Sequence, residues 1–204
     1  MIIGPKYKIA RRLGAPIFEK TQTQKFALSL ARKEKNGKRG FARPKSNFGM
    51  QLLEKQKARF TYCVTEKQFS KYAKQALASS DANPLGNFFE ALELRADNVA
   101  YRAGLASTRL GSRQMVSHGH IMVNEKRITI PSMRLKIGDV ISIREASKGK
   151  PLFANLEERL KTYTTPSWLA LDFDKKEASI QGMPKYQKTD SLFDMNAILE
   201  FYSR

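Results

Sequence analysis

Cationic and hydrogen-bonding side chains gather in the middle of the chain, between residues 108 and 127. Arg109 and Arg113 are four residues apart, a spacing that puts both guanidinium groups on one side of a helix. Guanidinium groups bind phosphate oxygens in pairs and stack on exposed bases, while imidazole and amide groups can hydrogen-bond to RNA hydroxyls and base edges. The residues of this stretch that we predict to bind RNA are Thr108, Arg109, Arg113, Gln114, His118, His120, Asn124, Lys126 and Arg127.

Two simpler interpretations stay open on the spacing alone. An arginine pair is often just the solvated face of a helix, and His118 and His120 could be ordinary turn residues. If the two histidines contact phosphate as cations, affinity should rise as the pH drops through about 6.5. Because the chain has two histidines and one cysteine, Cys63, it offers too few ligands for a usual structural zinc site, and we expect no metal and no cofactor.

Two short helices and a hairpin must position these side chains. Asp97 or Asn98 can cap a helix that ends at Gly104. Thr108 can cap the next helix, and the expected inner face of that helix consists of Ser112, Met115 and Val116. Alternating apolar residues then predict strands at 121–123, 128–130 and 140–144.

The flanking segments read mainly as helices. Apolar spacing predicts two helices within 48–80 and a third that begins at Leu85. After residue 150 it predicts another helix around Leu156 and Leu160, a strand-like stretch after Trp168, and a last short helix at 195–202.

The charge of the chain points to a polyanionic partner. The sequence has 37 Lys and Arg against 19 Asp and Glu, a formal net charge of +18. Residues 1–75 alone hold 19 basic and 4 acidic side chains, and the densest run, 32–45, reads as an extended basic arm. A disordered solubilising tail is the alternative for that run. Outside the central stretch the residues predicted to bind RNA are Arg11, Arg12, Arg39, Arg43, Lys45, Lys55, Lys57 and Arg102.

Other classes of protein fit the sequence poorly. An enzyme that modifies RNA would need a nucleotide loop or clustered acids, and we find neither a Walker-type loop nor a histidine outside the central stretch. The longest stretch without a charged residue is 114–124, too short for a membrane span, and no apolar segment for secretion opens the chain. We therefore expect no membrane and no small-molecule substrate as partners.

Residues along the whole chain carry a family resemblance. Segments 96–104, 108–109, 112–124, 130–132 and 138–141 resemble the RNA-binding module named after ribosomal protein S4. The flanks resemble the S4 family itself, in the segments 4–6, 9–14, 48–49, 51–52, 54–57, 66–69, 166–169 and 200–204. The resemblance runs from end to end and leaves no gap long enough for an extra domain.

The resemblance implies an α+β fold in four parts. Residues 1–46 would be a basic N-terminal arm, and 47–94 a helical domain joined by the C-terminal helix 195–204. Residues 95–158 would form the helix-helix-β-hairpin (alpha-L) RNA-binding module, with 159–194 as a strand and loop segment packed on it. Relatives often carry Gly after Asn124, where this chain has Glu125, so the turn type of the hairpin stays open and an acid lies near the expected RNA face.

The resemblance also implies a function without catalysis. The protein would be a structural constituent of the small ribosomal subunit that binds the 5′ domain of small-subunit rRNA at a multi-helix junction. It would nucleate assembly and contribute to decoding accuracy and to the region where mRNA enters. Its implied partners are that rRNA, the neighbouring ribosomal protein S5 and its own mRNA, on a cytoplasmic or an organellar ribosome. The alternative is a stand-alone or enzyme-associated RNA-binding protein that uses the same module.

Overall fold

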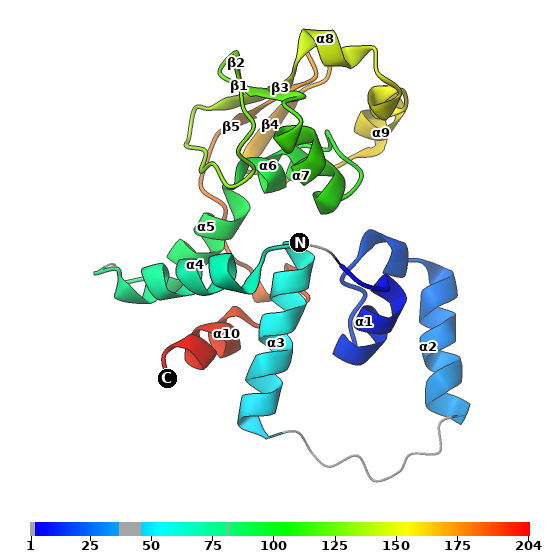
Figure 1. Ribbon diagram of the computed structural model, residues 1–204, viewed down its shortest axis with the longest axis vertical. Helices are drawn as coiled ribbons and strands as arrows, with labels where there is room; N and C mark the ends of the chain where they lie inside the picture. Colours follow the sequence, from blue (N-terminus) through cyan, green and yellow to red (C-terminus); the bar gives the residue numbers. More distant parts are fainter. Residues whose placement is uncertain (1–2, 37–45, 81) are drawn as a thin grey trace. The chain divides into compact units, whose positions relative to one another are not determined.

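The structure, a computed structural model, describes residues 3–36, 46–80 and 82–204 of the chain. Its internal contacts divide the chain into two units, which Figure 1 shows in the colours of the sequence. Unit 1 consists of residues 1–85 and 186–204, and unit 2 of residues 86–185. The C-terminal segment therefore returns to the unit in which the chain begins.

Every regular element in the described part of unit 1 is a helix. Its elements are α1 (Lys6–Leu13), η1 (Glu19–Thr21), α2 (Gln24–Asn36), α3 (Asn47–Thr61), α4 (Glu66–Ala78), η3 (Lys188–Asp190) and α10 (Met195–Tyr202). Ser46 and Thr65 cap α3 and α4, since their hydroxyl oxygens accept hydrogen bonds from the third residue of each helix. In Figure 1 α10 lies beside α3 and α4, and ring contacts from Phe201 to Phe48 and from Tyr202 to Phe69 join these helices. These contacts place α10 in the same unit as α3 and α4.

The expected extended arm at 1–46 is wrong over the described residues 3–36, which form α1, η1 and α2. The physical reason is a small apolar core, which the count of charged residues does not reveal. Ala10, Leu13, Phe18 and Phe26 are each at most 4% exposed and pack with Phe60 of α3. Burial of these side chains outweighs the repulsion among the surrounding cations. Residues 37–45, which hold most of the densest basic run, lie outside the described residues.

Unit 2 combines short helices with one antiparallel sheet. Its helices are α5 (Pro84–Glu93, which starts in unit 1), α6 (Ala96–Arg102), α7 (Arg109–Ser117), α8 (Glu145–Lys148), η2 (Pro151–Phe153) and α9 (Leu156–Thr162). Its strands are β1 (Ile121–Val123), β2 (Lys126–Arg127), β3 (Val140–Ile143), β4 (Leu169–Asp172) and β5 (Glu177–Ile180). They are arranged in the order β2-β1-β3-β5-β4, with every neighbouring pair antiparallel.

One apolar core holds the helices of unit 2 to its sheet. Val116 of α7, Ile121 of β1, Ile141 of β3, Leu160 of α9 and Ile180 of β5 are all at most 2% exposed. The predicted inner face of α7 is confirmed, because Ser112, Met115 and Val116 are all buried. The α+β class and the strands at 121–123 and 140–144 are also confirmed, with β3 ending one residue early.

The sheet extends further than the sequence pattern predicted. Strand β5 pairs with β3, with Ile141 opposite Ala178, so β4 and β5 of the segment 159–194 continue the sheet of the module, and Leu169, Ala178 and Ile180 lie in its core. The predicted strand at 128–130 is wrong: β2 ends at Arg127, and although Ile128 is buried, Ile130 is 62% exposed. The apolar alternation there reflects a single buried side chain.

A two-residue turn closes the hairpin between β1 and β2. Val123 pairs with Lys126, and the two residues between them, Asn124 and Glu125, have φ values of 49° and 63°. Positive φ at both positions defines a type I′ turn, whose twist matches that of the flanking strands. Asn tolerates this left-handed conformation better than Glu does, so the turn stores strain at Glu125.

We expect Glu125→Gly to raise the free energy of unfolding of unit 2 by about 0.5–1 kcal/mol, because glycine adopts the positive φ without strain. Urea unfolding followed by the fluorescence of Trp168, the one tryptophan of the chain, reports on this unit. Glu125→Gln is the matched control, since it removes the charge but keeps the strained conformation. Equal stabilisation by both variants would mean that charge, and not backbone strain, is responsible.

Candidate nucleic-acid interface

The first turn of α7 positions the two arginines of the candidate nucleic-acid interface. The Thr108 hydroxyl oxygen accepts a hydrogen bond from the Gly111 amide at 3.0 Å, which confirms the predicted cap. Arg109 and Arg113 are partly exposed and Gln114 is exposed, while the opposite side of the helix is buried. Thr108 thus positions the arginines, and its hydroxyl is used within the protein.

A buried carboxylate holds Arg113 in place. Asp97 is 3% exposed and accepts hydrogen bonds from Arg95 Nε and Nη2 at 3.0 and 2.9 Å. It also accepts from Arg113 Nε at 2.8 Å. The expectation that Asp97 or Asn98 caps α6 is wrong, because the helix begins after Arg95 without a side-chain cap. Two guanidinium groups bind the Asp97 carboxylate, and these charged hydrogen bonds are stronger than the single hydrogen bond that a cap would form.

A second buried carboxylate holds the other two arginines, one directly and one through an amide. Glu93, 1% exposed, accepts hydrogen bonds from Arg102 Nε at 2.9 Å and Nη2 at 2.8 Å. The Asn98 side chain donates to Glu93 Oε2 at 2.9 Å and accepts from Arg109 Nε at 2.9 Å. The Arg109 guanidinium also lies 4.3 Å from the centre of the Tyr101 ring, a cation–π contact.

These contacts define an α6–α7 arginine cluster, made of Arg95, Arg102, Arg109 and Arg113 with Glu93 and Asp97. The cluster has four guanidinium groups and two carboxylates, so it keeps a positive balance. The Arg95 side chain is only 3% exposed, whereas those of Arg102 and Arg113 are 33% and 19% exposed. The carboxylates therefore fix the direction of guanidinium groups whose edges reach the surface, which suits recognition of phosphate.

The hairpin contributes cations, and its turn asparagine is fully engaged. The Asn124 side chain donates to Asp139 Oδ1 at 2.8 Å and accepts from the Val140 amide at 2.9 Å, which ties the turn to β3. Lys126 and Arg127 are exposed on β2. The Arg127 guanidinium donates to the His118 carbonyl and crosses Gly119, where a Cβ atom would lie 2.1 Å from Arg127 Nε.

The two histidines lie next to one another at the end of α7. Their ring centres are 6.0 Å apart, and His120 Nδ1 lies 3.0 Å from the hydroxyl oxygen of Ser147. Burial lowers the pKa of His120 below its ordinary value, and the charges of Lys150, His118, Arg127 and Arg144 lower it further. Both effects favour the neutral form of the His120 ring in the free protein.

The predicted residues of unit 1 differ in exposure. Arg11 and Arg12 are exposed in the last turn of α1. Lys57 is paired with Glu54 at 2.7 Å. Arg39, Arg43 and Lys45 lie outside the described residues.

Lys55 is built into the helical core of unit 1. Its side chain is 8% exposed, and its Nζ lies 2.8 Å from Glu66 Oε1 and 4.3 Å from the Phe201 ring centre. Burial acts to raise the pKa of Glu66, but hydrogen bonds from Lys55 and Tyr202 and the charges of Lys55 and Arg59 outweigh it and lower that pKa. Lys55 thus stabilises the docking of α10 and is not one of the proposed RNA contacts.

Sequence reasoning missed the internal partners of the arginines and the cations that follow β3. Glu93 and Asp97 lie 9 and 16 residues from their partners Arg102 and Arg113, and no short spacing predicts such pairs. Arg144 follows β3 directly, and its amide donates to the His120 carbonyl at 2.9 Å. The alternation of apolar and polar residues in β1 and β3 could have indicated this neighbour. Pairing of these two strands places Arg144 beside His120.

The described residues lack the features of two other kinds of site. Across 3–36, 46–80 and 82–204, no three His, Cys, Asp or Glu side chains are grouped as metal ligands would be. No helix in that part of the chain is long and apolar enough to span a membrane.

The fold and the arginine cluster of unit 2 define a class of protein. Residues 94–141, which hold α6, α7, the hairpin and the start of β3, match the family described as "S4 domain". Unit 2 is accordingly built on an RNA-binding S4 domain, with β4, β5 and α9 added after it.

The rest of the chain makes the assignment narrower. Residues 1–93 match the family described as "Ribosomal protein S4/S9 N-terminal domain". The chain is 38% identical to "Small ribosomal subunit protein uS4" of Chloroflexus aurantiacus over 208 residues, which cover 99% of this chain and 98% of that protein. It is 40% identical to "Small ribosomal subunit protein uS4A" of Alkaliphilus metalliredigens, over 97% of this chain and 96% of the relative. It is 39% identical to "Small ribosomal subunit protein uS4" of Levilactobacillus brevis, over 98% of this chain and 98% of the relative. The chain belongs to the uS4 family.

Proposed function

We propose that this protein is a structural component of the small ribosomal subunit that binds small-subunit rRNA and carries out no catalysis. The observation that carries the proposal is similarity over nearly the whole chain to proteins named small ribosomal subunit protein uS4. The net charge of +18 supports it, because a polyanion as large as rRNA offsets the repulsion among so many cations. The proposed location is the ribosome.

A finer proposal follows from the family resemblance. The protein binds the 5′ domain of the rRNA at a multi-helix junction, helps to nucleate assembly, and contributes to decoding accuracy and to the region where mRNA enters. Ribosomal protein S5 is its proposed neighbour, and its own mRNA a second RNA ligand. A junction offers dense phosphate and irregular shape, which two folded units of this charge could match.

Within unit 2 the proposed RNA contacts come from two places. The first is the exposed edge of the α6–α7 arginine cluster, with Gln114 beside it. The second is the hairpin, through Lys126 and Arg127. Thr108 and Asn124 support these contacts by capping α7 and by tying the turn to β3. In unit 1 the exposed pair Arg11 and Arg12 adds phosphate contacts.

We expect Arg109→Ala and Arg113→Ala each to weaken binding of small-subunit rRNA by about 1–3 kcal/mol, as for other nucleic-acid contacts of arginine. Filter binding at fixed salt measures the loss. Lys175→Ala is the matched control, since Lys175 is an exposed cation of the same unit in the turn between β4 and β5, at the far edge of the sheet from β2. Unchanged affinity in both arginine variants would remove the arginine cluster from the interface.

Co-sedimentation with ribosomal subunits tests the proposed function itself. At salt concentrations that strip weakly bound proteins, we expect the chain to stay on the small-subunit core. A stand-alone RNA-binding protein would be released under these conditions. Recovery on the large subunit alone would contradict the proposal.

A further inference from the structure

Arg159 of α9 bonds to the backbone that follows α6. Its Nε donates to the Gly104 carbonyl at 2.9 Å, and its Nη2 donates to the Leu105 carbonyl at 2.8 Å. Gly104 and Leu105 are both buried, and a buried carbonyl oxygen needs a hydrogen-bond donor. One planar guanidinium group therefore satisfies two carbonyls at the point where the chain leaves α6. Figure 1 shows α9 in yellow beside the green chain that joins α6 to α7.

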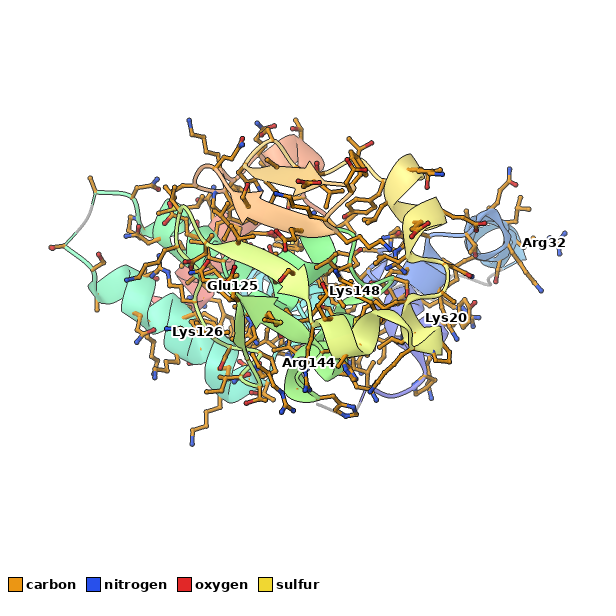
Figure 2. The ribbon with its side chains drawn as sticks, turned by 90° about the horizontal axis from the view of Figure 1, so that it is seen from above. Lys20, Arg32, Glu125, Lys126, Arg144 and Lys148 are labelled. Atoms are coloured by element: carbon orange, nitrogen blue, oxygen red, sulfur yellow. The ribbon has the colours of Figure 1, made fainter. Side chains whose placement is uncertain are left out.

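The Arg159 guanidinium serves this backbone and is not held by an acid. In the part of the chain that the structure describes, it forms no ion pair with a carboxylate. In Figure 2 Arg144 and Lys148 mark α8, and the yellow ribbon beyond them leads to α9. Since α9 lies after residues 94–141, a segment outside the matched S4 domain holds the connection between α6 and α7.

Two further side chains from α9 and its end pack against the same place. A Cβ atom on Gly104 would lie 3.0 Å from Leu160 Cδ2 and 3.0 Å from Tyr163 Cδ1, so both side chains contact the backbone there closely. The Tyr163 hydroxyl donates to the Tyr101 carbonyl in the last turn of α6 at 3.4 Å. The end of α6 is thus fixed by hydrogen bonds and by packing.

Tyr101 links this contact to the α6–α7 arginine cluster. The Arg109 guanidinium lies 4.3 Å from the centre of the Tyr101 ring. Burial raises the pKa of the Tyr163 hydroxyl and Tyr101 raises it further, whereas the charges of Arg102 and Arg109 act to lower it. Tyr163 therefore lies near enough to both arginines for their charges to act on it. A shift of the end of α6 would move the ring on which Arg109 lies.

We propose that Arg159 is a positioning residue for RNA binding, which holds the end of α6 and thereby the Tyr101 ring and the Arg109 guanidinium. This inference rests on the proposed function, because that function makes Arg109 an RNA contact. Arg159 uses its Nε and Nη2 on the carbonyls of Gly104 and Leu105 and does not itself contact RNA. Without it two buried carbonyls lose their donor, and the connection between α6 and α7 loosens.

The first test uses the free full chain and needs no RNA. The NMR resonance of the Arg109 Nε–H group reports on the Tyr101 ring, because an aromatic ring shifts the resonances of protons near its face. We expect Arg159→Ala to move this resonance towards that of an exposed arginine. Arg159→Lys, which keeps the charge and one donor group, should move it less. Lys161→Ala is the matched control, since it removes an exposed cation from the same helix, and it should leave the resonance in place.

An unmoved Arg109 resonance in folded Arg159→Ala would overturn the proposal. Urea unfolding followed by Trp168 fluorescence shows whether each variant is folded. If Arg159→Ala does not fold, the comparison passes to Arg159→Lys, which should still move the resonance more than Lys161→Ala does. Equal effects of these two variants would then overturn the proposal.

The second test is a double-mutant cycle on the affinity for small-subunit rRNA, which isolates the coupling between two side chains. We expect Arg159→Ala to weaken binding by about threefold to tenfold in the wild-type chain, as for residues coupled through shared contacts. In a chain that already carries Arg109→Ala, the same change should cost less than about twofold, because the group that Arg159 positions is then missing. Lys161→Ala should have the same small effect in both backgrounds.

A purely structural role and a direct phosphate contact both predict a different result for this cycle. If Arg159 only stabilised the fold, or if it bound phosphate itself, its loss would weaken binding equally with and without Arg109. Equal losses in the two backgrounds would therefore overturn the positioning role.

The two proposals fail in different ways. If the wild-type chain does not prefer small-subunit rRNA to bulk RNA, the proposed function is wrong, and Arg159 has no RNA contact to position. If the wild-type chain does prefer it, and the loss caused by Arg159→Ala does not depend on Arg109, the function stands and only the positioning role is rejected.

Discussion

Asp97→Ala should lower the free energy of unfolding of unit 2 by about 3–5 kcal/mol, the usual cost of removing one partner from a buried ion pair. The carboxylate is 4% exposed and accepts hydrogen bonds from two guanidinium groups. One of them belongs to Arg95, which is itself 3% exposed and would lose the carboxylate that pairs with its charge. The loss of Asp97 therefore costs far more than an ordinary surface mutation.

Urea unfolding followed by Trp168 fluorescence measures this loss, because Trp168 and Asp97 both belong to unit 2. Asp174→Ala is the control, because it removes an exposed carboxylate from the turn after β4 in the same unit. We expect the control to change the free energy of unfolding by less than about 0.5 kcal/mol. If Asp97→Ala behaves like the control, the buried carboxylate does not organise the arginine cluster.

The affinity for small-subunit rRNA should fall steeply as salt is added. If about ten phosphates are neutralised, the slope of log K against log salt is about −7 to −9. Between 50 and 200 mM salt this slope corresponds to a loss of about 10⁴–10⁵ in affinity. The physical reason is the release of counterions from the RNA by the Lys and Arg excess of the chain, 37 against 19 acids.

A titration of binding against potassium chloride measures the slope directly. An unrelated protein of similar net charge should show a comparable slope on bulk RNA but no preference for small-subunit rRNA. A slope shallower than about −3 would contradict an interface spread over both units.

Local signals predicted the centre of unit 2 well. Thr108 as a cap and the spacing of Ser112, Met115 and Val116 were sufficient to place α7 and its buried face, because caps and amphipathic periodicity act within one turn or two. The positive φ at Gly104 likewise agrees with the helix end that this glycine predicted. The strands at 121–123 and 140–144 followed from short-range alternation.

Features that depend on distant residues could not be predicted in this way. The helices at the start of unit 1 are held by Phe18 and Phe26, which pack with Phe60 of α3. No local pattern in this strongly basic part of the sequence predicts that contact. The pairing of β3 with β5 joins residues almost forty positions apart.

The candidate interface likewise combines features that local spacing predicted with features that it did not predict. The arginine pair of α7 was visible from its spacing, but the carboxylates that hold the cluster were not. Asp97 was expected to cap a helix, since its position before an apolar run has that appearance in the sequence. Only the folded chain brings Arg95 and Arg113 to the same carboxylate.

Chemical footprinting on full-length small-subunit rRNA tests the central claim most directly. Our account predicts that the chain protects one contiguous region, the multi-helix junction of the 5′ domain, and that Arg109→Ala and Arg113→Ala weaken this protection while Lys175→Ala leaves it intact. Protection scattered over the rRNA without a preferred region, or confined to large-subunit rRNA, would contradict the account.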